Sequence, residues 1–187
     1  MKIILGSNSP RRKELLEHLG IAFDTRSVDF EEHINDQLAH DEIPSDIVRQ
    51  KLDKMADTQA ADELLICADT LVFHEGTPLG KPNSHIEAVA MLQRLSGKNH
   101  EVITAVGIAH RGQRVIFKEH TAVHFEVLSM DDINRYVNNF NPLDKAGSYG
   151  IQEWIGLIGV SRIEGSYTNV MGLPTHRLYQ ELKKFNV

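Results

Sequence analysis

Two arginines stand where an apolar run gives way to a helical repeat, in the stretch GSNSPRR at residues 6–12. Ser9 is the predicted N-cap and Pro10 the first helical residue, so backbone N–H groups lie free at the start of this helix. Arg11 and Arg12 in the first turn oppose the helix dipole, whereas a bound anion would turn the same cations into an advantage. The stretch therefore predicts an anion site, and a solvated first turn is the alternative.

A carboxylate and a lysine mark two further loops. Asp69 interrupts the apolar run LLICADTLVF, so it either faces a cleft at the end of the strand or caps a turn. Lys81 stands between Gly80 and Pro82, where it is a candidate for reaching a phosphate. Glu32 lies in an acidic loop and could supply oxygen to a divalent metal, although such residues are commonly solvated.

Other chemistries lack the residues that they need. His120 and His124 share a predicted strand face, but a third metal ligand is missing, so we expect surface positions. Cys67 is expected to be a small buried hydrophobe. Neither the Walker loop nor the dinucleotide motif G-x-G-x-x-G occurs, which excludes those phosphate sites.

The elements that must position these residues alternate between strand and helix in the first half, and strands cluster later. This order predicts an α/β or α+β fold with a mixed sheet. The expected strands cover residues 2–5, 64–73, 101–110 and 114–128, with another beginning in FDTRSVDFEEH at residues 23–33. The expected helices cover residues 10–20, 44–61 and 84–97, and two more begin near residues 129 and 174.

Length and composition bound the class of protein. The chain has 187 residues, 41% of them hydrophobic, and we expect one domain over residues 1–187. The net charge of −6 argues against broad nucleic-acid binding. A single cysteine fits a reducing compartment, and neither a signal peptide nor an apolar span of about 20 residues is evident, so we expect a cytoplasmic protein without a membrane partner.

Five stretches in order carry a resemblance to a known family. They are SNSPRRKELLEHLG, ADTLV, GKP, PLDKAGSYGIQ and GSYTNVMGLP. Together they resemble the Maf family, described as septum-formation inhibitors and as nucleoside triphosphate pyrophosphatases, over nearly the whole chain. The resemblance implies a two-lobed α/β fold with a central mixed sheet and a cleft between the lobes, similar to the inosine-triphosphate pyrophosphatases.

The resemblance also implies a reaction and its residues. A nucleoside triphosphate would be hydrolysed between the α and β phosphates, to a monophosphate and pyrophosphate, with Mg²⁺ or Mn²⁺ as cofactor. Asp69 matches the family's proton acceptor and would also contact the metal, together with Glu32. Ser7, Arg12 and Lys81 match phosphate-site residues.

A lysine on the second helix belongs to the same pattern. Lys54 fits this position, but the local match VRQKLDKMA is weaker, and Lys51 competes for it.

Three positions resemble the dTTP/UTP subgroup of the family: Arg11, Thr70 and Gln152. The amide of Gln152 offers both a donor and an acceptor to a uracil-type edge, and the hydroxyl of Thr70 could add to the same contact. Two departures are small. FEEH replaces a more usual Asp-Glu pair, which leaves the metal ligand open, and Ser148 stands where alanine is common.

The expected protein is thus a dTTP/UTP pyrophosphatase, with pyrimidine nucleoside triphosphates as partners and modified pyrimidine nucleotides as further substrates. Two alternatives stay open: the same chemistry on 7-methyl-GTP, and a regulator of cell division that binds nucleotides without turnover. The long strand pair at residues 101–127 is compatible with a homodimer.

Overall fold

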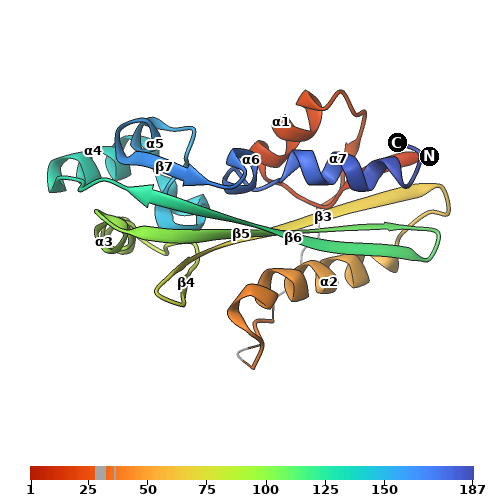
Figure 1. The fold of residues 1–187 in the computed structure, drawn as a ribbon. Coiled ribbons are helices and arrows are strands. Elements are labelled where there is room, and N and C mark those ends of the chain that lie inside the picture. Colours follow the sequence, from red (N-terminus) through yellow and green to blue (C-terminus); the bar gives the residue numbers. More distant parts are fainter. Residues whose placement is uncertain (28–32, 36) are drawn as a thin grey trace. The chain divides into compact units, whose positions relative to one another are not determined.

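A computed structural model describes residues 1–27, 33–35 and 37–187, and Figure 1 shows its ribbon. Within these ranges the strands are β1 (Lys2–Leu5), β2 (Asp24–Thr25), β3 (Glu63–His74), β4 (Thr77–Leu79), β5 (Asn99–His110), β6 (Gln113–Phe125) and β7 (Val160–Glu164). The α-helices are α1 (Pro10–His18), α2 (Ile43–Ala56), α3 (His85–Leu95), α4 (Met130–Phe140), α5 (Trp154–Gly159), α6 (Tyr167–Val170) and α7 (Thr175–Lys183).

All the strands of the described ranges belong to one mixed sheet in the order β2-β1-β3-β5-β6-β7, and β4 pairs with β3. The strand β1 runs parallel to both of its neighbours, and Leu5 lies opposite Ile66 of β3. Arg111 and Gly112 connect β5 to β6 with positive φ angles of 47° and 78°, the geometry of a tight hairpin turn. The mixed α/β class is therefore confirmed.

The chain divides into two compact units. The first consists of residues 1–69, 104–119 and 172–187, and the second of residues 70–103 and 120–171. In the first unit α2 covers one face of the sheet, and α1 and α7 cover the other (Figure 1). The apolar stripe of α2, with Val48, Leu52 and Met55, packs on strand residues such as Leu65, which fixes which side of α2 faces the sheet.

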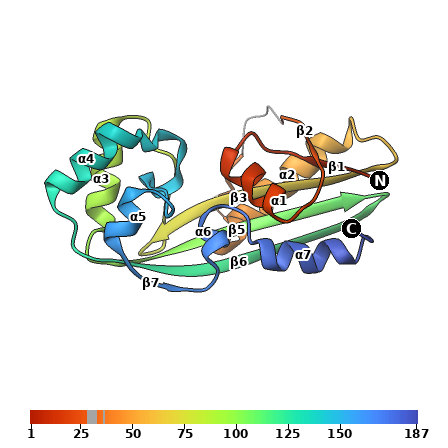
Figure 2. The ribbon, with the colours of Figure 1, turned by 90° about the horizontal axis from the view of Figure 1, so that it is seen from above.

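The second unit has its own core. Leu92 of α3, Tyr136 of α4 and Ile155 of α5 are all fully buried and pack with Val102 and Val123 of the sheet. Figure 2 shows these three helices gathered together. This core fixes the loop before α3, which carries Lys81, and the segment after α4, which carries Gln152.

Local end signals are confirmed at three helices. Ser9, Ser84 and Ser129 each accept a hydrogen bond from the backbone N–H three residues on. The helix expected to reach residue 61 instead ends at Ala56, because the Thr58 hydroxyl and backbone N–H both bond back to the carbonyl of Met55. Among the described residues, none of the helices has the length and apolar character to cross a membrane.

Candidate active site

The loop between β1 and α1 is built around two serine hydroxyls in the first unit. The Ser9 hydroxyl accepts the backbone N–H of Arg12 at 3.5 Å and so caps the helix. The Ser7 hydroxyl is almost buried and accepts the backbone N–H of Ser9 at 3.2 Å. Acidic residues are absent from the first turn of α1, so its N-terminus presents only polar N–H groups and cations. Such a helix end is suited to an anion.

Arg12 is held in place by two contacts. Its Nε donates to the carbonyl of Gly172 at 2.8 Å, and its Nη1 donates to the Ser7 hydroxyl at 3.4 Å. Gly172 belongs to the late stretch GSYTNVMGLP, so the first and last motifs meet at this guanidinium. Arg11, the neighbouring cation, is half-buried.

Asp69 forms a buried ion pair with Lys51, a contact that was not predicted from the sequence. Its Oδ1 lies 2.7 Å from the Nζ of Lys51, and each side chain is only 12% exposed. Its Oδ2 is buried and has no hydrogen-bond partner among the described residues. Asp69 therefore has one oxygen held by a cation and one oxygen available to a ligand.

Of the two lysines that compete for the second helix, the structure brings Lys51 to Asp69. Lys51 lies at the edge of the apolar stripe of α2, next to Val48 and Leu52, whereas Lys54 is exposed. The apolar period of α2 was the signal for this choice, since Lys51 falls within it and Lys54 does not.

The end of β1 lies beside the middle of β3, where Cys67 and Asp69 stand, so the strand pairing brings these groups together. Gly6 donates its backbone N–H to the carbonyl of Ile66 at 2.8 Å, and a Cβ on Gly6 would lie 2.8 Å from the Sγ of Cys67. Burial raises the pKa of the Cys67 thiol to about 12, although the nearby charges of Lys51 and Arg12 act in the opposite direction. Cys67 is therefore a buried apolar residue, as predicted, and both cations lie close to it.

Of the two predicted metal ligands, the structure describes only Asp69. Glu32 lies outside the described residues. Among the residues that the structure describes, no group of three His, Cys, Asp or Glu side chains is arranged to hold a metal ion. The unpartnered Oδ2 of Asp69 is still a suitable hard ligand, because Mg²⁺ commonly binds one or two carboxylates and completes its shell with substrate phosphates.

A second set of predicted residues lies in the second unit. The backbone N–H of Gly147 donates to the carbonyl of Gly80 at 3.1 Å, which joins the GKP loop to the KAGSYG stretch. Lys81 is exposed next to this joint, and Thr70 is half-buried in β3. The GKP and PLDKAGSYGIQ motifs thus meet within this unit.

Gln152 follows the same stretch and is half-buried. Its Oε1 atom is buried and lacks a hydrogen-bond partner within the described part of the chain. A buried amide oxygen without a donor costs free energy, about 1–3 kcal/mol, unless a ligand supplies one. The position that was predicted to read a base therefore has an amide oxygen that can accept a hydrogen bond from a ligand.

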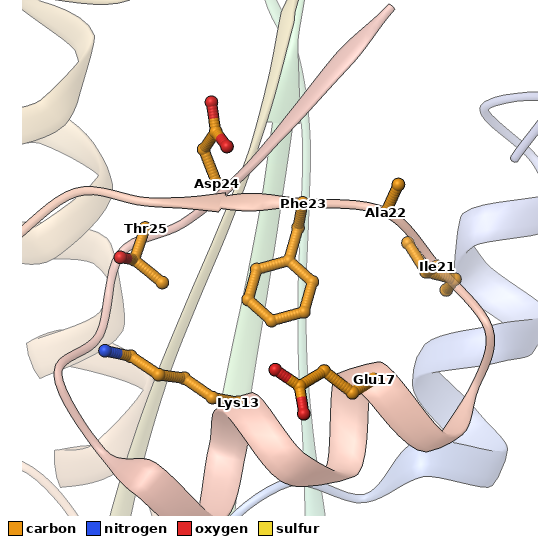
Figure 3. Close-up of a pocket in the computed structure, with 7 residues that line it drawn as sticks. All are labelled: Lys13, Glu17, Ile21, Ala22, Phe23, Asp24 and Thr25. Atoms are coloured by element: carbon orange, nitrogen blue, oxygen red, sulfur yellow. The ribbon is translucent and has the colours of Figure 1, made fainter.

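A pocket of about 450 Å³ lies elsewhere in the first unit (Figure 3). The Phe23 side chain points toward α1, where Lys13 and Glu17 form one wall. The other lining residues are Ile21, Ala22, Asp24 and Thr25. Because the lining includes none of the predicted site residues, this pocket is separate from the candidate active site.

Comparisons with known proteins agree with the motifs. The family model described as Maf-like protein matches residues 2–185. A dTTP/UTP pyrophosphatase from Bacteroides fragilis (strain YCH46) is 50% identical, with 98% of this chain and 95% of the relative covered. A protein of the same name from Phocaeicola vulgatus is 51% identical over the same shares of the two chains.

A solved structure supports the fold. The Staphylococcus aureus Ham1 protein is 13% identical, matches over the full length of both chains and has a TM-score of 0.53. At this identity the likeness concerns the fold alone. The motifs, the family model and the close relatives agree, and the chain belongs to the Maf family.

Proposed function

We propose that this protein hydrolyses dTTP and UTP to the nucleoside monophosphate and pyrophosphate. Relatives of that name share half of its residues over nearly its whole length, which supports the choice of substrate. The single observation that carries the reaction is the buried carboxylate of Asp69, one oxygen of which is paired with Lys51 while the other has no partner among the described residues.

Phosphate binding is assigned to the cations and donors at the start of α1. The triphosphate carries several negative charges, which must be neutralised and held in line for attack. Ser7, Arg11, Arg12 and Lys81 are the proposed contacts, and the N–H groups of the first turn of α1 add to them. The bond from Arg12 to Gly172 aims its guanidinium before substrate binds.

Asp69 is the proposed proton acceptor. A water oxygen attacks the α-phosphorus, the bond from that phosphorus to the bridging oxygen of the β-phosphate breaks, and pyrophosphate leaves. The carboxylate takes the proton of the attacking water, a role typical of Asp and Glu in general base catalysis. Lys51 positions the carboxylate, because it holds Oδ1 at 2.7 Å and leaves Oδ2 for a ligand.

A divalent metal, Mg²⁺ or Mn²⁺, belongs to the proposal. Asp69, together with Glu32 of the acidic loop, would hold it. When bound, it would neutralise phosphate charge and lower the pKa of water.

Selection of the base is assigned to Gln152 and Thr70, and Lys54 is proposed as a further substrate contact. A uracil or thymine ring carries one N–H between two carbonyls, so it donates to the Oε1 of Gln152 and accepts from its amide N–H₂. We place the reaction in the cytoplasm, without nucleic acid or membrane as partners, and the homodimer stays a prediction.

The test is pyrophosphate release from dTTP, UTP, CTP, GTP and 7-methyl-GTP, with and without Mg²⁺ or Mn²⁺. Metal-dependent turnover of dTTP and UTP is expected, and Asp69→Asn should lower it by about 10²–10⁴-fold. Asp62→Asn, an exposed substitution of the same kind, is the matched control. Turnover of 7-methyl-GTP alone would overturn the substrate assignment. Binding of UTP without turnover would favour the regulator.

A further inference from the structure

A backbone hydrogen bond joins the two ends of the turn that carries Gln152. The backbone N–H of Glu153 donates to the carbonyl of Gly150 at 3.0 Å, so residues 150–153 form a tight turn with Gln152 at its third position. The direction in which the Gln152 side chain points therefore depends on how this turn is held.

One buried hydroxyl holds both ends of the turn. The Tyr136 side chain of α4 is 0% exposed, and its hydroxyl accepts the backbone N–H of Gly150 at 3.0 Å. The same hydroxyl donates to the Oε2 of Glu153 in a short hydrogen bond. Burial, and after it the Glu153 carboxylate, raise the pKa of Tyr136 well above its ordinary value, so the hydroxyl stays a donor at neutral pH.

Lys145 holds the second oxygen of the Glu153 carboxylate. The Nζ of Lys145 lies 3.2 Å from the Oε1 of Glu153 and 2.7 Å from the Oδ1 of Asp144. A Cβ on Gly150 would lie only 2.7 Å from the Cδ of Glu153, so a larger residue at position 150 would displace that carboxylate. Lys145, Glu153 and Tyr136 therefore form a continuous network, in which Lys145 and Tyr136 are buried and Glu153 is half-buried, and this network ends on the Gln152 turn.

We infer that Tyr136 and Glu153 are positioning residues that aim the Gln152 amide at the pyrimidine base and thereby set selection for a ring N–H. This inference rests on the proposed function. The reason is geometric. The buried Oε1 of Gln152 has no hydrogen-bond partner among the described residues, and it can discriminate between a ring N–H and a ring nitrogen without hydrogen only if its position is fixed. The ring nitrogen of cytosine that corresponds to the uracil N–H carries no hydrogen, so CTP is the discriminating competitor.

The experiment compares two buried tyrosines. Tyr136→Phe removes the hydroxyl that holds the turn and keeps the ring, which stacks on Phe140 at 5.1 Å. Tyr149→Phe, the matched control, also removes one buried hydroxyl, but that hydroxyl bonds to His100 at 2.7 Å and not to the turn. Each variant is assayed for kcat/KM on UTP and on CTP.

In Tyr136→Phe, the ratio of kcat/KM for UTP to kcat/KM for CTP is expected to fall by about tenfold. A change of this size corresponds to the loss of one ordinary hydrogen bond, here the bond between the ring N–H and Gln152. The control should keep the wild-type ratio even if it unfolds at a lower temperature. Glu153→Gln keeps an oxygen for Tyr136 but loses the charge that faces Lys145, so it should cause a smaller fall. It also carries the test if Tyr136→Phe does not fold.

A second readout does not depend on turnover. The side-chain amide signal of Gln152 in the ¹⁵N NMR spectrum, assigned by its loss in Gln152→Glu, should shift or broaden in Tyr136→Phe and stay in place in Tyr149→Phe. A wild-type enzyme without preference for UTP would refute the proposed function, while this signal would still test the positioning. An unchanged ratio together with an unchanged signal would overturn the inference itself.

Discussion

The buried ion pair of Lys51 and Asp69 leads to a prediction about stability: the effect of replacing Asp69 should change sign when Lys51 is also replaced. Each side chain is 12% exposed, so removal of one partner leaves a charge that water screens poorly. Lys51→Met takes the cation from Oδ1, and Oδ2 already lacks a partner among the described residues. Breaking a buried pair in this way typically costs about 3–5 kcal/mol of unfolding free energy.

Asp69→Asn should act in opposite directions with and without the lysine. In the wild-type protein it leaves the Lys51 charge facing a neutral amide and should destabilise by about 1–3 kcal/mol. In the Lys51→Met background it removes an unpaired buried carboxylate, so it should stabilise. The coupling free energy between the two positions should be at least about 1 kcal/mol.

The assay is urea unfolding at pH 7 of the wild type, both single variants and the double variant, followed by circular dichroism. The midpoint should fall most for Lys51→Met and recover in the double variant. If the two single effects add to within about 0.5 kcal/mol, the pair is not coupled. The assignment of Lys51 as the residue that positions Asp69 would then fail.

Three further outcomes follow from buried groups. Burial lowers the pKa of His100 to about 3, below the unfolded value of about 6.5, so the unfolded chain binds the proton first as the pH falls. The free energy of unfolding should therefore drop by about 2 kcal/mol from pH 7.5 to pH 5. Urea titrations at the two pH values should show this drop in the wild type and in Tyr149→Phe but not in His100→Gln. The Cys67 thiol, with a pKa of about 12, should resist iodoacetamide in the folded protein at pH 8, and mass spectrometry showing rapid alkylation would contradict its burial. Gly6→Ala would push a methyl group against the sulfur atoms of Met55 and Cys67, so differential scanning calorimetry should report a loss of about 1–3 kcal/mol, and unchanged stability would speak against this close packing.

Local chemistry explains what the sequence could predict. The caps at Ser9, Ser84 and Ser129 were predictable because a cap is a contact between residues three apart. The charged positions Asp69 and Lys81 could be singled out because a charge within or beside an apolar strand has few structural uses, but Asp69 was expected at a strand end or a turn, and β3 instead continues past it to His74. Such signals need no knowledge of how distant segments pack.

Contacts between distant segments could not be predicted in the same way. The bond from Arg12 to Gly172 joins residues 160 positions apart, and neither residue type implies the other. The choice of Lys51 over Lys54 depended on which face of α2 packs on the sheet. The apolar period contained that choice, whereas the family pattern alone left Lys51 and Lys54 as competitors for the lysine of the second helix.

Two of the positions assigned to ligand contacts have a buried side-chain oxygen without a hydrogen-bond partner among the described residues: Asp69, with its Oδ2, and Gln152, with its Oε1. Folded proteins satisfy most buried polar groups, so each such oxygen costs about 1–3 kcal/mol unless it is paired. The two oxygens differ in what satisfies them, since a carboxylate suits a cation or the proton of a water and an amide oxygen suits an N–H. Asp69 in the first unit and Gln152 in the second therefore each keep a polar atom whose cost a ligand would offset, and the chemistry of that atom indicates which part of a nucleotide it would meet.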